Sequence, residues 1–162
     1  MFEQIITALV AAGVRFVVVG GVAATVQGSA RLTNDLDLCY DAAPDNVTAL
    51  VRLLHTWHAY LRGVERGLPF VLDERALRAM PLMTLTTEVG DIDLLDSVLG
   101  VGTYADAFTR SESVAIGAIE FRALTLQALI ASKRATGRAK DLEHLIELEA
   151  LLAMRRKEGR AR

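Results

Sequence analysis

Two pairs of aspartates are the residues of this sequence best suited to chemistry. Asp35 and Asp37 alternate with apolar residues in the run 35–41, and Asp91 and Asp93 do the same in the run 91–95. Such alternation predicts a half-buried strand, in which residues two apart point to the same side. Each pair therefore sets two carboxylates side by side, which costs Coulomb energy unless a cation lies between them. Carboxylate oxygens of this kind favour Mg²⁺ or Mn²⁺.

The placement of the two predicted strands decides how many carboxylates meet. If the strands are neighbours in one sheet, three or four carboxylates converge on a small area. The alternative is that both strands are sheet edges whose aspartates only face water. We favour the metal interpretation because aspartate is uncommon in strands and two strands here carry a pair each. Asp91 and Asp93 are both candidates for the third ligand.

A pair of glycines, Gly20 and Gly21, precedes the first aspartate pair. It follows the apolar run 15–19, which predicts a strand, and precedes the Ala-rich run 22–27, which predicts a short helix. Glycines at such a turn let backbone N–H groups approach an anion closely, although many turns use glycine for geometry alone. Followed by the aspartate pair, this turn favours a phosphate cradle beside a divalent-metal site.

The elements that must position these residues form a mixed pattern. We predict helices at 2–10, 44–54, 73–80 and about 104–108, and strands at 83–87, 114–116 and 120–124. Thr125 is the expected N-cap of a helix that ends near Gly137, and a last helix follows over 140–156. Within 57–81, Arg62-Gly63 and Arg66-Gly67 are typical of turns, and the pattern predicts no strand there. The hairpin over 83–95 favours a mixed sheet, and hence an α+β (mixed α/β) fold.

Length and composition bound the class of protein. The 162 residues predict a single domain, 1–162, whose helical C-terminal part covers about 125–157. A hydrophobic content of 52% excludes an intrinsically disordered chain, and the single cysteine excludes a disulfide framework. The longest apolar run, Phe16 to Val26, is shorter than the roughly 18 residues that a membrane span needs. With no basic segment at its start, the chain is expected to be cytoplasmic, without membrane partners.

Charge is unevenly distributed along the chain. The first hundred residues hold 7 Lys and Arg against 12 Asp and Glu, whereas the remainder holds 11 against 8. An acidic front and a basic back are consistent with a polyanion or a metal between them. The basic tail 155–162 is open to two interpretations: it contacts RNA phosphates, or it complements a helix C-terminus.

At this point the sequence resembles the nucleotidyltransferase superfamily of DNA polymerase β type. The resemblance is carried by the hydrophobic strand ending in Gly20-Gly21, by Asp35-Leu36-Asp37 and by Asp93 on a later strand. Residues 28–35 and 132–142 are similar to the Gly-x-x-Arg-x-Thr-x-Asp and Lys…Arg-x-Lys-Asp-Leu segments of a small bacterial branch that includes AbiEii-type and MenT-type toxins. The resemblance implies the nucleotidyltransferase fold. In this fold a short mixed sheet carries the carboxylates, helices flank the sheet, and a pair of helices follows at the C-terminus.

The resemblance also implies an activity and its residues. A nucleoside monophosphate would pass from an NTP to an acceptor hydroxyl, with two Mg²⁺ (or Mn²⁺) ions held by Asp35, Asp37 and Asp93. Asp93 would also be the general base, and Asp91 is the alternative to Asp93 as the third carboxylate ligand. The implied nucleotide-binding residues are Gly20, Gly21, Arg31, Thr33, Lys133 and Lys140. Lys133 and Lys140 could instead lie on helix surfaces, and Arg31 could pair with a loop carboxylate. Asp141 could form an ion pair with Arg31 or Arg138.

The resemblance implies RNA, in particular tRNA, as the acceptor class, and a cognate antitoxin as partner. One departure is Gly21, which stands where many relatives have serine and so lacks a hydroxyl for phosphate. Two alternatives are kept: nucleotidylation of a small molecule or protein hydroxyl, and a catalytically idle nucleotide-binding module.

Overall fold

The computed structural model describes residues 1–160, and the side chain of Arg160 is not described. The end of the basic tail considered above for RNA binding therefore lies outside the described residues. The strands are β1 (Phe16–Val19), β2 (Asp35–Tyr40), β3 (Tyr60–Leu61), β4 (Leu82–Thr87), β5 (Gly90–Leu95), β6 (Ser97–Val98), β7 (Gly102–Thr103), β8 (Ser111–Ile116) and β9 (Ile119–Leu124). The helices are α1 (Phe2–Ala11), α2 (Gly20–Val26), α3 (Pro44–Thr56), α4 (Glu74–Ala79), α5 (Tyr104–Thr109), α6 (Leu126–Thr136) and α7 (Leu142–Arg160), with a 3-10 turn at Ala139–Asp141.

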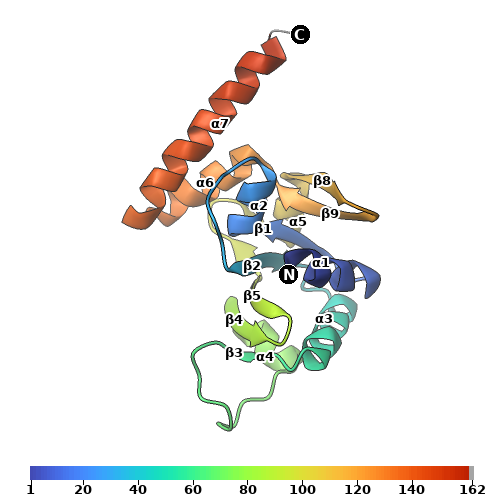
Figure 1. The fold of residues 1–162 in the computed structure, drawn as a ribbon. Helices are drawn as coiled ribbons and strands as arrows, with labels where there is room; N and C mark the ends of the chain where they lie inside the picture. Colours follow the sequence, from blue (N-terminus) through green and yellow to red (C-terminus); the bar gives the residue numbers. More distant parts are fainter. Residues whose placement is uncertain (161–162) are drawn as a thin grey trace.

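A seven-stranded mixed sheet forms the centre of the molecule, in the order β3-β4-β5-β2-β1-β9-β8 (Figure 1). β2 pairs with β5 in parallel and with β1 antiparallel, while β1 pairs with β9 in parallel. The expected α+β fold with a mixed sheet is therefore confirmed. β2 and β5 lie inside the sheet, which rules out the alternative that the aspartates sit on edge strands.

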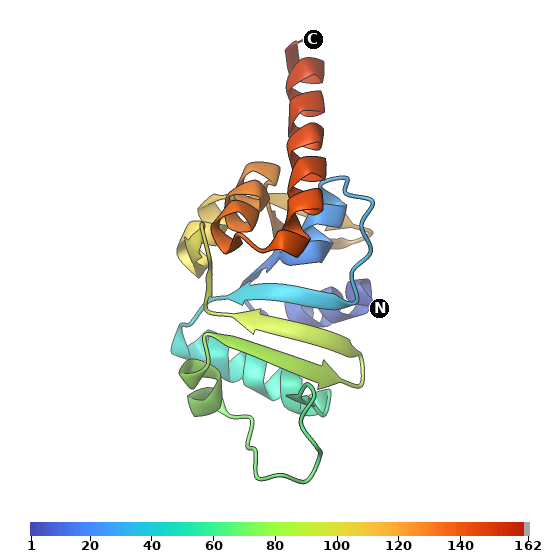
Figure 2. The same cartoon turned by 90° about the vertical axis from the view of Figure 1, so that its left-hand side faces the viewer.

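The core explains why the aspartates share one face. Leu36 and Leu38 of β2, and Ile92 and Leu94 of β5, are almost fully buried, so the residues between them face the other way. Helices α1 and α3 lie behind β2, β5 and β4 in Figure 2 and cover the apolar face. The opposite face is left to the carboxylates.

The two C-terminal helices confirm the expected helical pair. Thr125 caps α6 by accepting a hydrogen bond from the backbone N–H of Ala128, and Gly137 ends the helix in a left-handed conformation with φ 61°. Both views show the C-terminal half of α7 standing clear of the rest of the chain (Figures 1 and 2). Lys140 lies in the 3-10 turn rather than in the last helix, because Arg138 pairs with Asp141 three residues on and closes a tighter turn.

The main differences from the sequence prediction are short strands that it did not include. Tyr60 and Leu61 form the edge strand β3 against β4, and two further short strands, β6 and β7, pair with each other. Two-residue strands are too short for alternation to be visible in a sequence. No helix within residues 1–160 combines the length and the apolar character needed to cross a membrane.

Candidate active site

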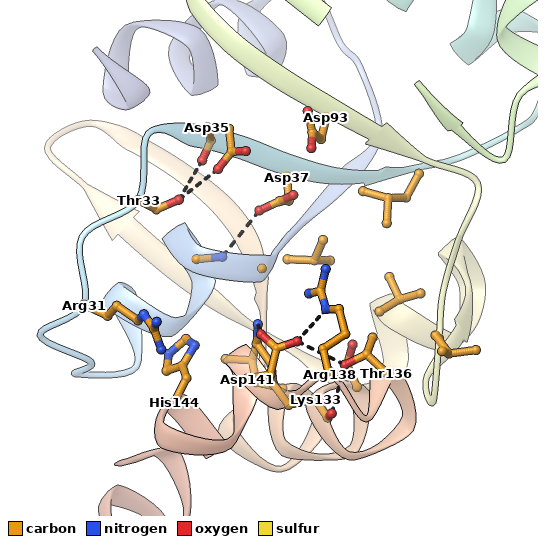
Figure 3. A pocket seen from close by; sticks show the side chains of 18 of the residues that line it. Arg31, Thr33, Asp35, Asp37, Asp93, Lys133, Thr136, Arg138, Asp141 and His144 are labelled. Atoms are coloured by element: carbon orange, nitrogen blue, oxygen red, sulfur yellow. Dashed lines mark hydrogen bonds and ion pairs between the residues drawn. The ribbon is translucent and has the colours of Figure 1, made fainter. Parts of the chain in front are cut away.

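The strand register brings the four aspartates together. Asp35 pairs with Asp91, and Asp37 with Asp93, across the parallel strands β2 and β5. Paired positions of adjacent strands carry their side chains on the same face, a few ångströms apart. The carboxylates of Asp35, Asp37 and Asp93 accordingly appear together on one side of the sheet in Figure 3.

Asp93 and Asp91 differ in how deeply they lie. The Asp93 side chain is 13% exposed and lines the main pocket, whereas the Asp91 side chain is 38% exposed and is not part of that lining. Asp93 therefore groups with Asp35 and Asp37, and Asp91 lies at the margin. Burial raises the pKa of Asp93 above its usual value, and the nearby Arg62 charge only partly opposes this rise.

Asp37 lies at the centre of the cluster. Burial, and then the charges of Asp35 and Asp93, raise its pKa to about 7. The backbone N–H of Gly21 opposes this by donating a hydrogen bond of 3.4 Å to Asp37 Oδ2. Bringing a cation to this site would lower the pKa of Asp37 again, since its charged form would gain a partner.

The two glycines are explained by close approach. Gly20 has φ +60°, and a Cβ atom there would stand 2.0 Å from Asp37 Oδ2. A Cβ atom on Gly21 would stand 2.6 Å from Thr33 Cβ and Oγ1. The turn between β1 and α2 thus passes directly against the carboxylates, and no side chain fits there.

Thr33, which the resemblance places in the nucleotide-binding set, contacts Asp35. Its Oγ1 donates to Asp35 Oδ1 at 3.0 Å and lies 3.3 Å from the backbone oxygen of the same residue. Since a hydroxyl hydrogen bond restricts the rotation of the carboxylate, Thr33 orients Asp35 (Figure 3).

The loop that carries Arg31 and Thr33 is held by α7, from the far end of the sequence. Glu147 accepts a hydrogen bond from the backbone N–H of Ala30 at 2.9 Å, and His144 Nε2 lies 3.3 Å from Ser29 Oγ. Burial, followed by the charges of Lys133 and Arg31, lowers the pKa of His144, so its ring is neutral near pH 7. The C-terminal helix is therefore part of the site's framework.

A pocket of about 700 Å³ opens over the carboxylates. Its walls come from the turn after β1, the loop before β2, the ends of β4 and β5, and the helices at the C-terminus (Figure 3). The lining residues are Val19, Gly20, Gly21, Arg31, Leu32, Thr33, Asp35, Asp37, Leu82, Asp93, Leu95, Val98, Leu99, Leu129, Ser132, Lys133, Thr136, Arg138, Lys140, Asp141 and His144. All nine residues predicted for the site line this one pocket.

Of the basic residues that line the pocket, two form ion pairs with Asp141 and two form none with the described residues. Lys133 Nζ lies 2.8 Å from Asp141 Oδ1, and Arg138 Nε lies 2.6 Å from Asp141 Oδ2. Burial alone would raise the pKa of Asp141, but these two partners hold it at about 2. Arg31 and Lys140 are exposed and form no ion pair with the part of the chain that the structure describes.

The cluster contains one residue that sequence reasoning missed, Arg62. Its Nη2 donates to Asp93 Oδ1 at 2.7 Å. Its Nε lies 3.3 Å from Asp91 Oδ2, and its Nη1 lies 3.5 Å from Asp35 Oδ2. A lone arginine before a glycine in a stretch of turns carries no signal for this position.

With Arg62 among them, the carboxylates do not form a ready-made ligand set. Among residues 1–160, no three His, Cys, Asp or Glu side chains are placed so that they could hold a metal ion as they stand. The guanidinium instead supplies positive charge to Asp35, Asp91 and Asp93.

Sequence comparison decides the family. Residues 1–159 match the profile of a family described as nucleotidyl transferase of unknown function (DUF2204). The chain belongs to this family. No curated protein matches it. Paired carboxylates on adjacent strands beside a glycine turn are compatible with membership in a nucleotidyl transferase family.

Proposed function

We propose that this protein is a Mg²⁺-dependent nucleotidyltransferase that moves a nucleoside monophosphate from an NTP to an acceptor hydroxyl, with RNA, in particular tRNA, as the acceptor. The observation that carries the proposal is the register of β2 and β5, which sets Asp37 beside Asp93 and leaves Asp35 on the same face. Membership in the nucleotidyl transferase family supports the reaction class.

The chemistry of the donor set fits a divalent cation. Mg²⁺ and Mn²⁺ prefer carboxylate oxygens, which Asp35, Asp37 and Asp93 supply. These ions complete their coordination shells with phosphate oxygens and water. Burial, and then repulsion from Asp35 and Asp93, raise the pKa of Asp37 to about 7, so a cation at this site would stabilise the charged form of Asp37. Bound Mg²⁺ would supply neutralisation of the triphosphate and of the charge that develops in the displacement.

The residues of the chain have distinct tasks in this proposal. Thr33 holds the Asp35 carboxylate in one orientation. Asp93, whose pKa is raised by burial, accepts the proton of the acceptor hydroxyl as that oxygen attacks the α-phosphorus. Asp35, Asp37 and Asp93 would together hold the metal, and the leaving group is pyrophosphate.

Two exposed cations support a phosphate-bearing substrate. Arg31 and Lys140 line the pocket without an ion-pair partner among residues 1–160, so their charges are available to the triphosphate. Lys133 lines the same pocket but forms an ion pair with Asp141. We therefore assign it both a structural role and a role in phosphate binding.

The choice of tRNA rests on the resemblance of residues 28–35 and 132–142 to AbiEii-type and MenT-type toxins. Under this proposal the protein acts as a toxin with a cognate antitoxin. Expression should arrest growth, and the product of a neighbouring gene should relieve the arrest.

The test is incubation of the purified protein with Mg²⁺, each α-labelled NTP and total tRNA, with aminoglycosides and candidate proteins as separate acceptors. Label should appear in tRNA with the wild type and be lost in Asp35→Asn and Asp93→Asn. The matched control is Asp91→Asn, which changes a carboxylate on the same strand and face but outside the pocket lining, and it should keep most of the activity.

Other outcomes of this experiment have definite meanings. Label in a small molecule or protein alone would move the acceptor to that class. No transfer to any acceptor would reject the proposal, and an NTP-dependent thermal shift in Mg²⁺ that remains would then identify a catalytically idle nucleotide-binding module.

A further inference from the structure

Arg62 lies in the same row of the sheet as two of the carboxylates. Its backbone N–H donates to the Thr84 carbonyl at 2.9 Å, Thr84 pairs with Asp93, and Asp93 pairs with Asp37. Residues in one row across a sheet share a face. The row therefore directs the Arg62 side chain over β4 toward the carboxylates, although Arg62 is 31 residues from Asp93 in sequence.

The guanidinium makes contacts of unequal quality. Besides Asp93 it donates to the Leu85 carbonyl at 3.1 Å, which fixes the head group over β4. Its Nε is buried and has no hydrogen-bond partner among the described residues, even though Asp91 Oδ2 is 3.3 Å away. A buried donor without a partner costs free energy, which offsets part of the stabilisation that the other contacts of Arg62 provide.

A guanidinium and a divalent cation at the same carboxylates repel each other. Mg²⁺ and Mn²⁺ approach a carboxylate oxygen to about 2.1 Å with near-octahedral surroundings. Asp93 Oδ1 already accepts a hydrogen bond from Arg62 Nη2 at an N···O distance of 2.7 Å, so a cation at this oxygen would lie close to the guanidinium charge.

We propose that Arg62 is a positioning residue that neutralises the carboxylate cluster in the metal-free protein, and that a divalent cation binds as the guanidinium withdraws. Arg62 and the cation compete for Asp35 and Asp93. This inference rests on the proposed use of those two residues as metal ligands, and it is independent of which acceptor is used.

The side chain has a route by which to withdraw. It is 29% exposed, and the residues that follow it, 63–69, are mostly exposed in the loop that extends beyond β3 and β4 (Figure 2). Since the Arg62 backbone is held by Thr84, rotation about the side-chain bonds suffices, and β3 stays in place.

The test measures Mn²⁺ binding by calorimetry, with the metal alone and neither NTP nor acceptor. Arg62→Gln should bind Mn²⁺ at least about tenfold more tightly than the wild type, because the competing charge is gone. Without metal its Tm should fall below that of the wild type, and Mn²⁺ should raise its Tm by more. Arg62→Lys, which keeps the charge but lacks the planar fork, should lie between the two.

The matched control is Arg66→Gln, which removes the same charge from the same loop, where Arg66 lies 6.0 Å over the Tyr60 ring. It should bind Mn²⁺ like the wild type. The gain in Arg62→Gln should disappear when Asp93→Asn is added, which places the ion at the cluster.

Equal or weaker Mn²⁺ binding by Arg62→Gln overturns the inference, and so does equal binding by Arg66→Gln and Arg62→Gln. If Arg62→Gln does not fold, the Arg62→Lys comparison decides alone. A protein that shows the competition but transfers no nucleotide refutes the proposed function and leaves this inference standing.

Discussion

Gly20 packs so closely against Asp37 that a Cβ atom on Gly20 would stand 2.0 Å from the Asp37 Oδ2 atom. The glycine also has φ +60°, so both its backbone conformation and its missing side chain are needed. Because Asp37 is the most buried carboxylate of the cluster, the geometry of the site depends on this turn.

Gly20→Ala should destabilise the protein and abolish transfer. The control is Gly13→Ala, which has a similar φ of +68° and open space around it, so that it carries the conformational cost alone, about 1–2 kcal/mol. Gly20→Ala should cost about 1–3 kcal/mol more from the steric clash with Asp37. Urea denaturation measures the difference, and equal losses in the two variants would show that Asp37 moves aside without cost.

The raised pKa of Asp37 predicts how stability varies with pH in metal-free buffer. The ordinary aspartate pKa is 3.8 and the folded value is about 7, so between these values the native protein keeps a proton that the unfolded chain has released. Asp37 therefore makes the free energy of unfolding fall as pH rises from about 4 to 7, with no further change above.

Asp37→Asn removes this titration. The variant should gain stability relative to the wild type as pH rises from about 5 to 8, and urea denaturation in EDTA at both values measures the gain. Asp91→Asn, at the margin of the cluster, serves as the comparison. A gain of Asp37→Asn that stays constant or shrinks across this range would contradict the assignment.

Thr33→Val should slow transfer with little effect on stability. The variant keeps the shape of the side chain and removes the hydrogen bond to Asp35, so the carboxylate loses its orientation. We expect a fall in kcat of about tenfold and a change in the free energy of unfolding below about 1 kcal/mol. Thr33→Ser retains the hydroxyl and should recover most of the rate; a Thr33→Ser variant as slow as Thr33→Val would assign the effect to the lost methyl group.

Lys133→Met and Lys140→Met distinguish a lysine charge that stabilises the fold from one that only binds phosphate. Lys133→Met removes a partly buried partner of Asp141 and should lower stability by about 1–3 kcal/mol, whereas Lys140→Met should leave it unchanged. Both should weaken the binding of a non-hydrolysable NTP, measured by calorimetry. If Lys133→Met lowers stability alone, Lys133 belongs to the framework and not to the nucleotide site.

The sequence by itself determined which residues share a face. The alternation around Asp35 and Asp93 is a local property with a period of two, and the apolar residues between the aspartates specify the buried side. The same local signals predicted the glycine turn, the cap at Thr125 and the C-terminal helical pair. The family resemblance added the candidate set, and all of it lines one pocket.

Only the tertiary structure decided which strands are neighbours, because strand pairing depends on contacts between residues far apart in sequence. The pairing of Asp37 with Asp93, the grip of α7 on the loop before Asp35, and the sharing of Lys133 with Asp141 all arise in this way. Arg62 is the clearest case. It follows a strand of two residues, too short to show a period, and its charge reaches the aspartates only because β3 adds to the edge of β4.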